Sequence, residues 1–203
     1  MIDKNISPQD WLSLEDQNER ENRITRLEWA KDHYPTISLI FFHGGLISKY
    51  LFEEARYCFV YRQFIASILL SLAFIEHTIA GLFYELPNNA LEEIGVSQNR
   101  LRRAGIFDLI KWALKLKWIS DDDFSFINYI REIRNPLVHP RPPSPIREDS
   151  DIEKADELLK DWWKEKIELR SIEEDKHPYT ILEDDARKSL LIAYRVLEIG
   201  SPG

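Results

Sequence analysis

Apolar residues recur three or four positions apart over most of the chain, which is the spacing of one face of an α-helix. Proline, glycine and Ser-Asp clusters interrupt this pattern and divide it into segments. The predicted helical segments are Pro8–Asp32, Lys49–Leu86, Phe107–Trp118, a helix that runs through Phe124 and Ile133, Asp151–Glu174 and Thr180–Ile199. Ser7 and Pro8 mark the start of the first, and the N-cap cluster Ser120-Asp121-Asp122-Asp123 starts the helix through Phe124. Residues Thr36–His43 fit either a short strand or the start of a buried helix. No multi-strand pattern is present, so the sequence predicts an all-α fold.

The organisation of the chain follows from the strongest of these segments. Lys49–Leu86 is the most apolar, and we expect it to be the central core helix, with an interruption left open. Residues 1–48 are predicted to form an N-terminal helical extension, and residues 49–203 a helical domain. Four of the six residues Pro140–Pro145 are proline, which prevents regular helix. Residues 140–178 are therefore predicted to be a proline-rich linker followed by an inserted helix.

Composition restricts the class of protein. The chain has 203 residues, of which 44% are hydrophobic, enough for one core without metal or disulfides. Cys58 is the only cysteine, so an intrachain disulfide is excluded. The most apolar run, Phe64–Ile75, is too short to span a bilayer, and no secretory signal opens the chain. We expect a cytoplasmic protein with no membrane association.

Charge changes this picture in one respect. The net charge of −8 argues against a broad nucleic-acid surface, because phosphate binding requires clustered basic residues. Positive charge nevertheless gathers in one stretch, at Arg100, Arg102, Arg103, Lys111, Lys115, Lys117, Arg131, Arg134, Arg141 and Arg147. A small basic site is therefore still possible.

The segment Tyr129–His139 carries the clearest motif, an amphipathic helix that ends in Arg134-Asn135-Pro136-Leu137-Val138-His139. This pattern resembles the signature of HEPN domains, in which Arg, a polar residue and a His follow such a helix. Ala55–Glu76 is similar to the long first helix of that family, and Glu183–Leu197 is similar to its last. The resemblance covers roughly residues 53–199 and implies an antiparallel helical bundle.

The resemblance to HEPN domains also implies a function. Many members are metal-independent endoribonucleases of toxin–antitoxin, antiviral (phage) defence or RNA-processing systems, and they commonly act as homodimers. It therefore implies RNA as substrate, a homodimer, an antitoxin or defence-complex protein as a further partner, and no cofactor or metal. Arg134, Asn135 and His139 are the implied catalytic residues.

These residue types suit the cleavage of RNA. A histidine with a pKa near neutrality can take the proton of a ribose 2′-OH or give one to the leaving oxygen. Arginine can stabilise the extra negative charge of the five-coordinate phosphate. On a straight helix, residues five apart lie about 140° apart around the axis. We therefore expect Pro136 to end or kink the helix near Arg134, so that His139 turns back toward the guanidinium.

Each residue near the motif also has a structural interpretation. Glu76 and His77 could face the motif in a supporting role, or could be a helix end in solvent, and Glu76 could pair with Arg134. Asn135 could be a helix cap. Arg131 and Arg141 could bind the phosphates of the substrate, or could be solvated surface residues.

Two other functions stay open beside the nuclease. A non-catalytic HEPN domain would act as a binding or assembly module for a protein partner, and the acidic charge fits this alternative. A nucleotide could also occupy the polar cleft in place of RNA.

Overall fold

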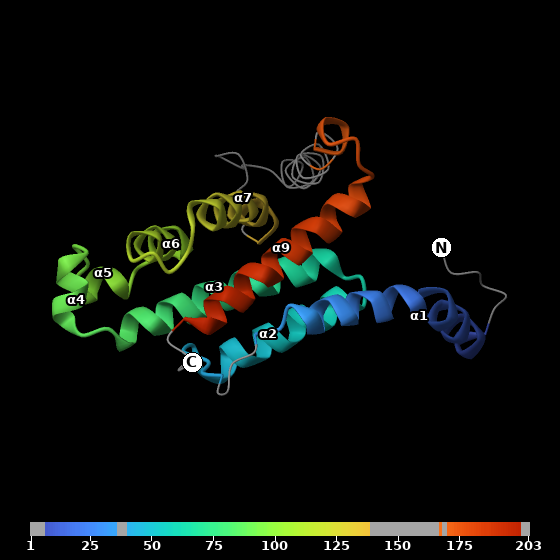
Figure 1. Cartoon of the computed structure of the whole chain (residues 1–203), viewed down its shortest axis with the longest axis horizontal. Helices are drawn as coiled ribbons and strands as arrows, with labels where there is room; N and C mark the ends of the chain where they lie inside the picture. The colour runs from blue at the N-terminus through green and yellow to red at the C-terminus, as the bar shows by residue number, and fades with distance from the viewer. Residues whose placement is uncertain (1–6, 36–39, 139–166, 168–169, 200–203) are drawn as a thin grey trace, which may run out of the picture.

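α3 (Phe64–Glu85) is the central helix of the structure, a computed structural model that describes residues 7–35, 40–138, 167 and 170–199. It packs against α2 (Gly45–Val60), α9 (Pro178–Glu198), α6 (Ile106–Lys115) and α7 (Asp121–Val138) (Figure 1).

The remaining helices complete one bundle. The short helices α4 (Asn88–Glu93) and α5 (Gln98–Leu101) connect α3 to α6, and α1 (Pro8–Asp32) lies against α2. The described residues contain helices and connections only, without a strand, so the predicted all-α fold is confirmed.

The core forms around the apolar residues of α3. Phe74, Ile79 and Phe83 are fully buried, and the ring of Phe74 lies 5.0 Å from that of Phe52 on α2. By length and composition α3 could cross a membrane, because the helix continues past the apolar run to Glu85. Half of the residues in its most apolar 18-residue stretch are buried inside the protein, which is typical of a core helix. The expected central helix is thus present.

The predicted core segment is divided into two helices. α2 ends at Val60, and α3 begins at Phe64 after a tight turn in which Arg62 adopts a left-handed conformation, with φ of 63°. The amide of Gln63 donates to the carbonyl of Cys58 at 2.7 Å, which satisfies an open carbonyl at the end of α2. The predicted boundary between the N-terminal extension (residues 1–48) and the helical domain (residues 49–203) lies inside α2, because that helix begins at Gly45.

Two glycines allow the chain before α2 to lie directly on α3. A Cβ at Gly81 would overlap the carbonyl group of His43 and lie 2.8 Å from the amide nitrogen of Gly44. A Cβ at Gly44 would lie 2.9 Å from the carbonyl oxygen of His77. The His43 ring is held in this contact by Glu85, whose carboxylate lies 2.8 Å from Nδ1. The start of α2 therefore contacts the backbone of α3.

We expect Gly81→Ala to destabilise the protein. Overlap with a backbone group costs about 1–3 kcal/mol, and the better helix propensity of alanine offsets about 1 kcal/mol of this. The matched control is Gly105→Ala, because a Cβ at Gly105 has no heavy atom within 4 Å. Urea unfolding followed by circular dichroism measures both free energies. Equal stability of the two variants would contradict this account of Gly81.

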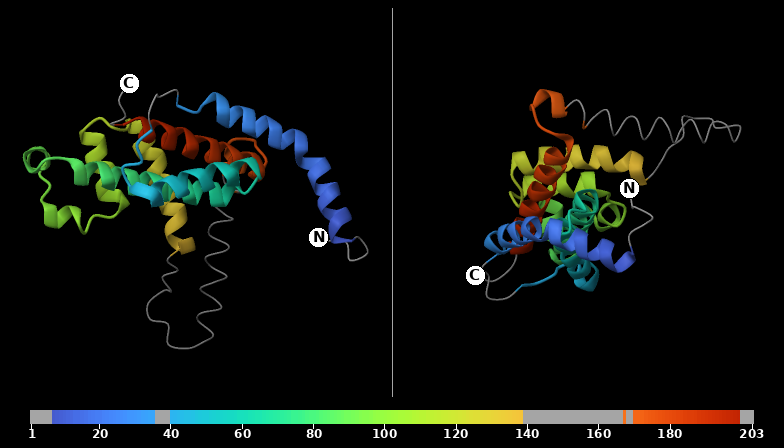
Figure 2. Two further views of the ribbon diagram at one scale, coloured as in Figure 1. Left: turned by 90° about the horizontal axis from the view of Figure 1, so that it is seen from below. Right: turned by 90° about the vertical axis from the view of Figure 1, so that its right-hand side faces the viewer.

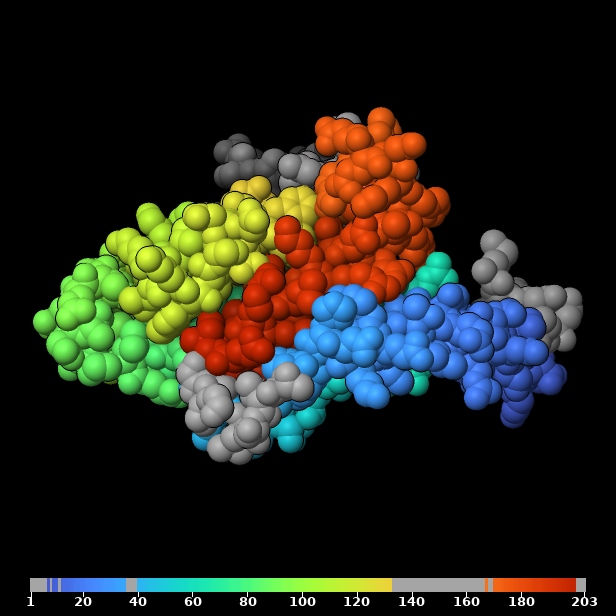
Figure 3. All heavy atoms as spheres, in the orientation of Figure 1, coloured from blue at the N-terminus to red at the C-terminus, as the bar shows by residue number. Residues whose placement is uncertain are grey.

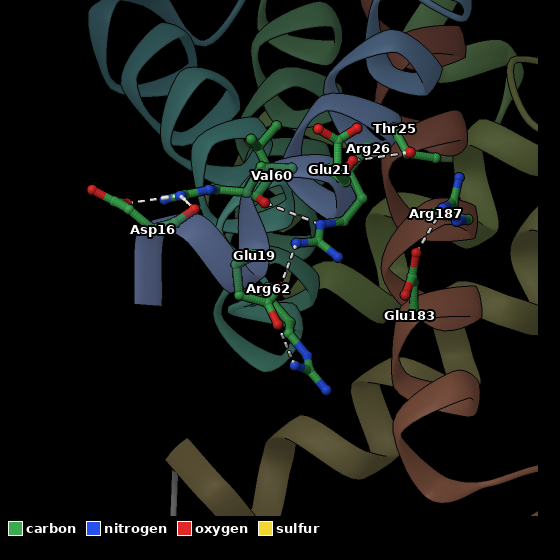
Figure 4. A network of polar contacts seen from close by, with 10 residues as sticks. Asp16, Glu19, Glu21, Thr25, Arg26, Val60, Arg62, Glu183 and Arg187 are labelled. Atoms are coloured by element: carbon green, nitrogen blue, oxygen red, sulfur yellow. Dashed lines mark hydrogen bonds and ion pairs between the residues drawn. The ribbon is translucent and has the colours of Figure 1, made fainter. Parts of the chain in front are cut away.

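α1 is attached through arginine side chains as well as apolar ones. Arg26, which is 5% exposed, donates from Nε to the carbonyl of Val60 at 3.0 Å, at the end of α2, and Glu19 accepts from both Arg26 and Arg62 (Figure 4). Arg187 of α9 lies 4.9 Å from the centroid of the Trp29 ring. The N-terminal part of α1 projects beyond the other helices (Figure 2).

Candidate functional site

α7 carries the motif and begins as the sequence predicts. The amide of Asp123 donates to Ser120 Oγ at 3.1 Å, and the amide of Ser120 donates to Asp123 Oδ2 at 3.3 Å. This reciprocal pair satisfies two amides at the start of the helix, where acidic side chains also oppose the positive end of the helix dipole. Asp121, Asp122 and Asp123 all lie in that first turn.

The helix does not end near Arg134. α7 continues to Val138 and includes Pro136, so the expectation of a helix end before the proline is wrong, whereas the expected kink stays a prediction. A proline removes only one backbone hydrogen bond, here the bond to the carbonyl of Glu132, and it disfavours but does not forbid helical geometry at Asn135.

The apolar face of α7 leads to the motif. Ile127 and Ile130 are buried, and position 134 follows them at spacings of seven and four residues, which places it on the same face of the helix. Ile127 and Ile130 border a narrow space together with Leu72 and Ile75 of α3. The backbone of residue 134 therefore lies on the same side of α7 as Ile127 and Ile130, which face α3.

The structure describes only part of the motif. Arg134 and Asn135 are helical in their backbone, but their side chains lie outside the described part of the chain. His139 and Arg141 lie wholly outside it, as does most of the predicted insertion 140–178. Whether Arg134 and His139 meet thus stays a prediction.

Glu76 and His77 are separated around α3. Glu76 is partly buried and follows Leu72 by four residues, so it shares the face of α3 that packs on α7. His77 is exposed, and its carbonyl lies beneath Gly44 on the other side of the helix. The structure therefore places Glu76, and not His77, on the side of α3 toward α7.

Arg131 is held in place on α7. Its Nε donates to Asn128 Oδ1 at 3.0 Å, Glu132 lies 3.8 Å from its Nη2, and its guanidinium lies 5.1 Å from the centroid of the Phe107 ring of α6. The sequence suggested Arg131 as a phosphate ligand, and its contact with Phe107 was not expected.

A buried polar cluster that the sequence did not indicate joins α7 to α9. The carboxylate of Asp185, 4% exposed, accepts from Arg170 Nη1 at 2.9 Å and from the Tyr129 hydroxyl at 3.3 Å. Arg170 also donates to Tyr129 at 2.8 Å and to Glu174 at 2.9 Å. The position of Asp185 in α9, four residues after Ile181 and four before Ser189, is the one sequence signal for a buried carboxylate.

Burial and hydrogen bonding act in opposite directions on the pKa values of this cluster. It raises the pKa of Asp185, against the lowering effect of Arg170, and together with the charge of Asp185 it raises the pKa of Tyr129. Although burial alone lowers the pKa of Arg170, hydrogen bonds to Asp185 and Tyr129 raise it overall. The hydrogen bond from Arg170 lowers the pKa of Glu174.

The cluster is a structural connection. The groove over it measures about 290 Å³, at the lower limit for small-molecule pockets. Its charged groups are paired with one another, since Lys176 lies 2.8 Å from Asp184 and 3.3 Å from Glu174. In the part of the chain that the structure describes, no three His, Cys, Asp or Glu residues are arranged so that they could hold a metal ion.

Comparison of the chain with protein-family models, with curated proteins and with solved structures found no significant match. The observed class is therefore an all-helical protein, and its function has to be argued from its own residues.

Proposed function

We propose that this protein is a metal-independent endoribonuclease of the HEPN type. One observation supports the proposal: the buried residues Ile127 and Ile130 of α7 pack on the face of α3 that bears Glu76, and position 134 follows them on the same side of the helix. In the proposed site, an arginine at that position lies beside the Glu76 carboxylate. Such a setting can fix the orientation of a guanidinium, which transition-state stabilisation requires.

In the proposed reaction, His139 accepts the proton of a ribose 2′-OH while the 2′ oxygen attacks the adjacent phosphorus. The P–O5′ bond then breaks, the 5′ oxygen is protonated, and a 2′,3′-cyclic phosphate is left. Arg134 stabilises the extra negative charge on the phosphate oxygens, with Asn135 as a further hydrogen-bond donor. Glu76 orients Arg134.

The direct test is cleavage of total RNA and of transfer RNA by the purified protein in excess EDTA. We expect cleavage to proceed and the new 3′ ends to carry a cyclic phosphate, detected by their resistance to 3′-end ligation before phosphatase treatment. Cleavage that stops with chelator would contradict a metal-independent mechanism. Absence of cleavage would favour the non-catalytic alternative.

An assembly role is the second candidate, and the outer face of α2 favours it. Leu46, Ile47, Tyr50, Tyr57 and Tyr61 are between 45% and 70% exposed. Positions 46, 50, 57 and 61 lie on one side of the helix. The exposed Glu53 lies among them and is paired with Lys49 at 3.8 Å, so the stripe is apolar with one ion pair within it. Exposed apolar surface of this kind is typical of a protein interface. We propose that two copies of the chain associate through this stripe, which places one α2 against the other about a twofold axis.

Charge on this stripe should prevent association. We expect Leu46→Glu/Tyr50→Glu to be monomeric where the unchanged protein is dimeric, because burying two carboxylates in an apolar interface is unfavourable. The control is Ile172→Glu, which alters a residue 78% exposed away from α2. Light scattering coupled to size-exclusion chromatography measures the mass. A dimeric double variant, or a monomeric unchanged protein at tens of micromolar, would refute this interface.

A further inference from the structure

The stretch from Gln98 to Lys117 has a charge opposite to that of the chain as a whole. It contains six basic residues and one acidic residue, whereas the full chain has a net charge of −8. All six basic residues are exposed. They are Arg100, Arg102, Arg103, Lys111, Lys115 and Lys117. This stretch covers α5 and α6, which form one continuous surface with α7 at the end of the molecule away from the start of α1 (Figure 3).

α6 presents part of this charge as a row. Phe107, Lys111 and Lys115 are spaced four residues apart and exposed, while Ile106, Ile110 and Ala113 on the other side of the helix are buried. The row is about 12 Å long, at 1.5 Å of rise per residue. Within the described residues, Lys111 and Lys115 form no ion pair, whereas Arg100 lies 3.7 Å from Asp108. Both lysines are therefore available to an anionic ligand.

The row continues onto α7 through Phe107. The guanidinium of Arg131 lies 5.1 Å from the centroid of the Phe107 ring, which is 42% exposed as a residue. Arg131 is held there by its hydrogen bond to Asn128 at 3.0 Å. Position 134 lies one helical turn beyond Arg131. Lys115, Lys111, Phe107 and Arg131 thus form a continuous line that leads to the motif on α7, and we call it the α6 ridge.

We propose that the α6 ridge binds the backbone of single-stranded RNA and directs it to the end of α7. Lys115, Lys111 and Arg131 bind successive phosphates, and Phe107 contacts a base or ribose between them. This inference rests on the proposed ribonuclease function, because it supplies the substrate path for that site.

Single-stranded RNA fits the ridge better than a duplex does. Single-strand sites combine a line of cations with exposed aromatic side chains, and both are present here. A duplex requires a broad basic surface, which the acidic remainder of the chain does not provide. The same acidic remainder repels the strand elsewhere and restricts it to the ridge.

Binding can be measured apart from cleavage. The probe is a fluorescein-labelled 12-nucleotide single-stranded RNA, and every protein carries His139→Ala so that the probe stays intact. We expect Lys111→Glu/Lys115→Glu to weaken binding at least tenfold. The slope of log K against log salt should become shallower by about 1.4, because each phosphate that a lysine no longer neutralises removes about 0.7 from it. Fluorescence anisotropy measures both quantities.

The control variant is Lys31→Glu/Lys49→Glu, which changes the net charge equally on α1 and α2. We expect it to bind the RNA within about twofold of the parent protein. Equal weakening by both double variants would show a general charge effect and overturn the ridge. Competition by a polyglutamate peptide as strong as that by unlabelled RNA would also overturn it, because the ridge would then fit an acidic protein.

The outcome separates this inference from the nuclease proposal. If the protein with His139 intact does not cleave RNA, yet the ridge variant alone loses RNA binding, the ridge is supported and the nuclease function is not. If RNA is cleaved but the ridge variant binds and cleaves normally, the nuclease function is supported and the ridge is rejected. Circular dichroism confirms that each variant keeps the helical fold.

Discussion

Replacement of His139 or Arg134 by alanine is expected to abolish RNA cleavage. Loss of a general acid or base typically lowers a rate about 10²–10⁴-fold. Loss of one group that stabilises the developing oxyanion lowers it about 10²–10³-fold. Each variant should therefore retain no more than about 1% of the cleavage rate of the unchanged protein. Single-turnover cleavage of a labelled RNA measures these rates.

The chain offers matched controls for this prediction. Arg20 and His33 are exposed on α1, away from α7, so Arg20→Ala and His33→Ala change the same residue types. Both should cleave at the rate of the unchanged protein. Arg134→Lys keeps the charge but loses the planar pair of donors, so it should stay far below full activity. Full activity of both Arg134→Ala and His139→Ala, with the helical fold intact, would reject the proposed mechanism.

Removal of Arg170 is expected to be among the most destabilising single substitutions outside the apolar core. Arg170→Ala leaves the Asp185 carboxylate buried, with the Tyr129 hydroxyl as its one donor among the described residues. Removing one partner of a buried ion pair lowers the free energy of unfolding by about 3–5 kcal/mol. We expect a loss near the lower end of this range, because the Arg170 side chain is 26% exposed. Urea unfolding at pH 7 measures the loss of unfolding free energy.

The pH dependence of Arg170→Ala identifies the cause of this loss. Without Arg170, burial acts on Asp185 against the Tyr129 hydrogen bond alone, so its folded-state pKa rises further above that of the unfolded chain. Protonation then favours the folded state, and stability should be regained as the pH falls from 7 toward 4. A loss that is independent of pH would point to lost packing and not to the stranded carboxylate.

Two further variants complete this test. Arg170→Met/Asp185→Leu removes both charges together and should recover most of the stability, since apolar residues can replace a buried ion pair without large cost. Lys176→Ala removes exposed ion pairs with Asp184 and Glu174 and should change the unfolding free energy by less than about 1 kcal/mol.

Local signals in the sequence were sufficient for most helices. Ser7 and Pro8 predict the start of α1, and Ser120 with its acidic neighbours predicts the start of α7, because caps act within one turn. The turn between α2 and α3 was left open because Arg62, and not glycine or proline, takes the left-handed conformation there. The end of α7 was predicted wrongly because a proline disfavours helical geometry at the preceding residue without forbidding it.

Contacts between distant segments could not be predicted from the sequence. Tyr129 and Asp185 are 56 positions apart, and Arg170 and Tyr129 are 41 apart, so no periodicity connects them. The same holds for Arg131 and Phe107. The motif itself could be recognised because Arg134 and Asn135 are adjacent and follow a helical pattern. The side of α7 that faces α3 became visible only through the packing of Ile127 and Ile130.

The manner in which α1 is attached divides the molecule into two levels of cooperativity. Ala30 and Arg26 are buried in α1, whereas Leu12, Leu14, Ile24 and Leu27 are between 39% and 57% exposed. The ion pairs of Glu19 with Arg26 and Arg62 are weakened by salt where they are exposed, whereas the buried Arg26 is screened much less. We therefore expect α1 to be a subglobal unfolding unit that opens while α2, α3 and α9 stay folded, with a free energy of opening that salt lowers only slightly.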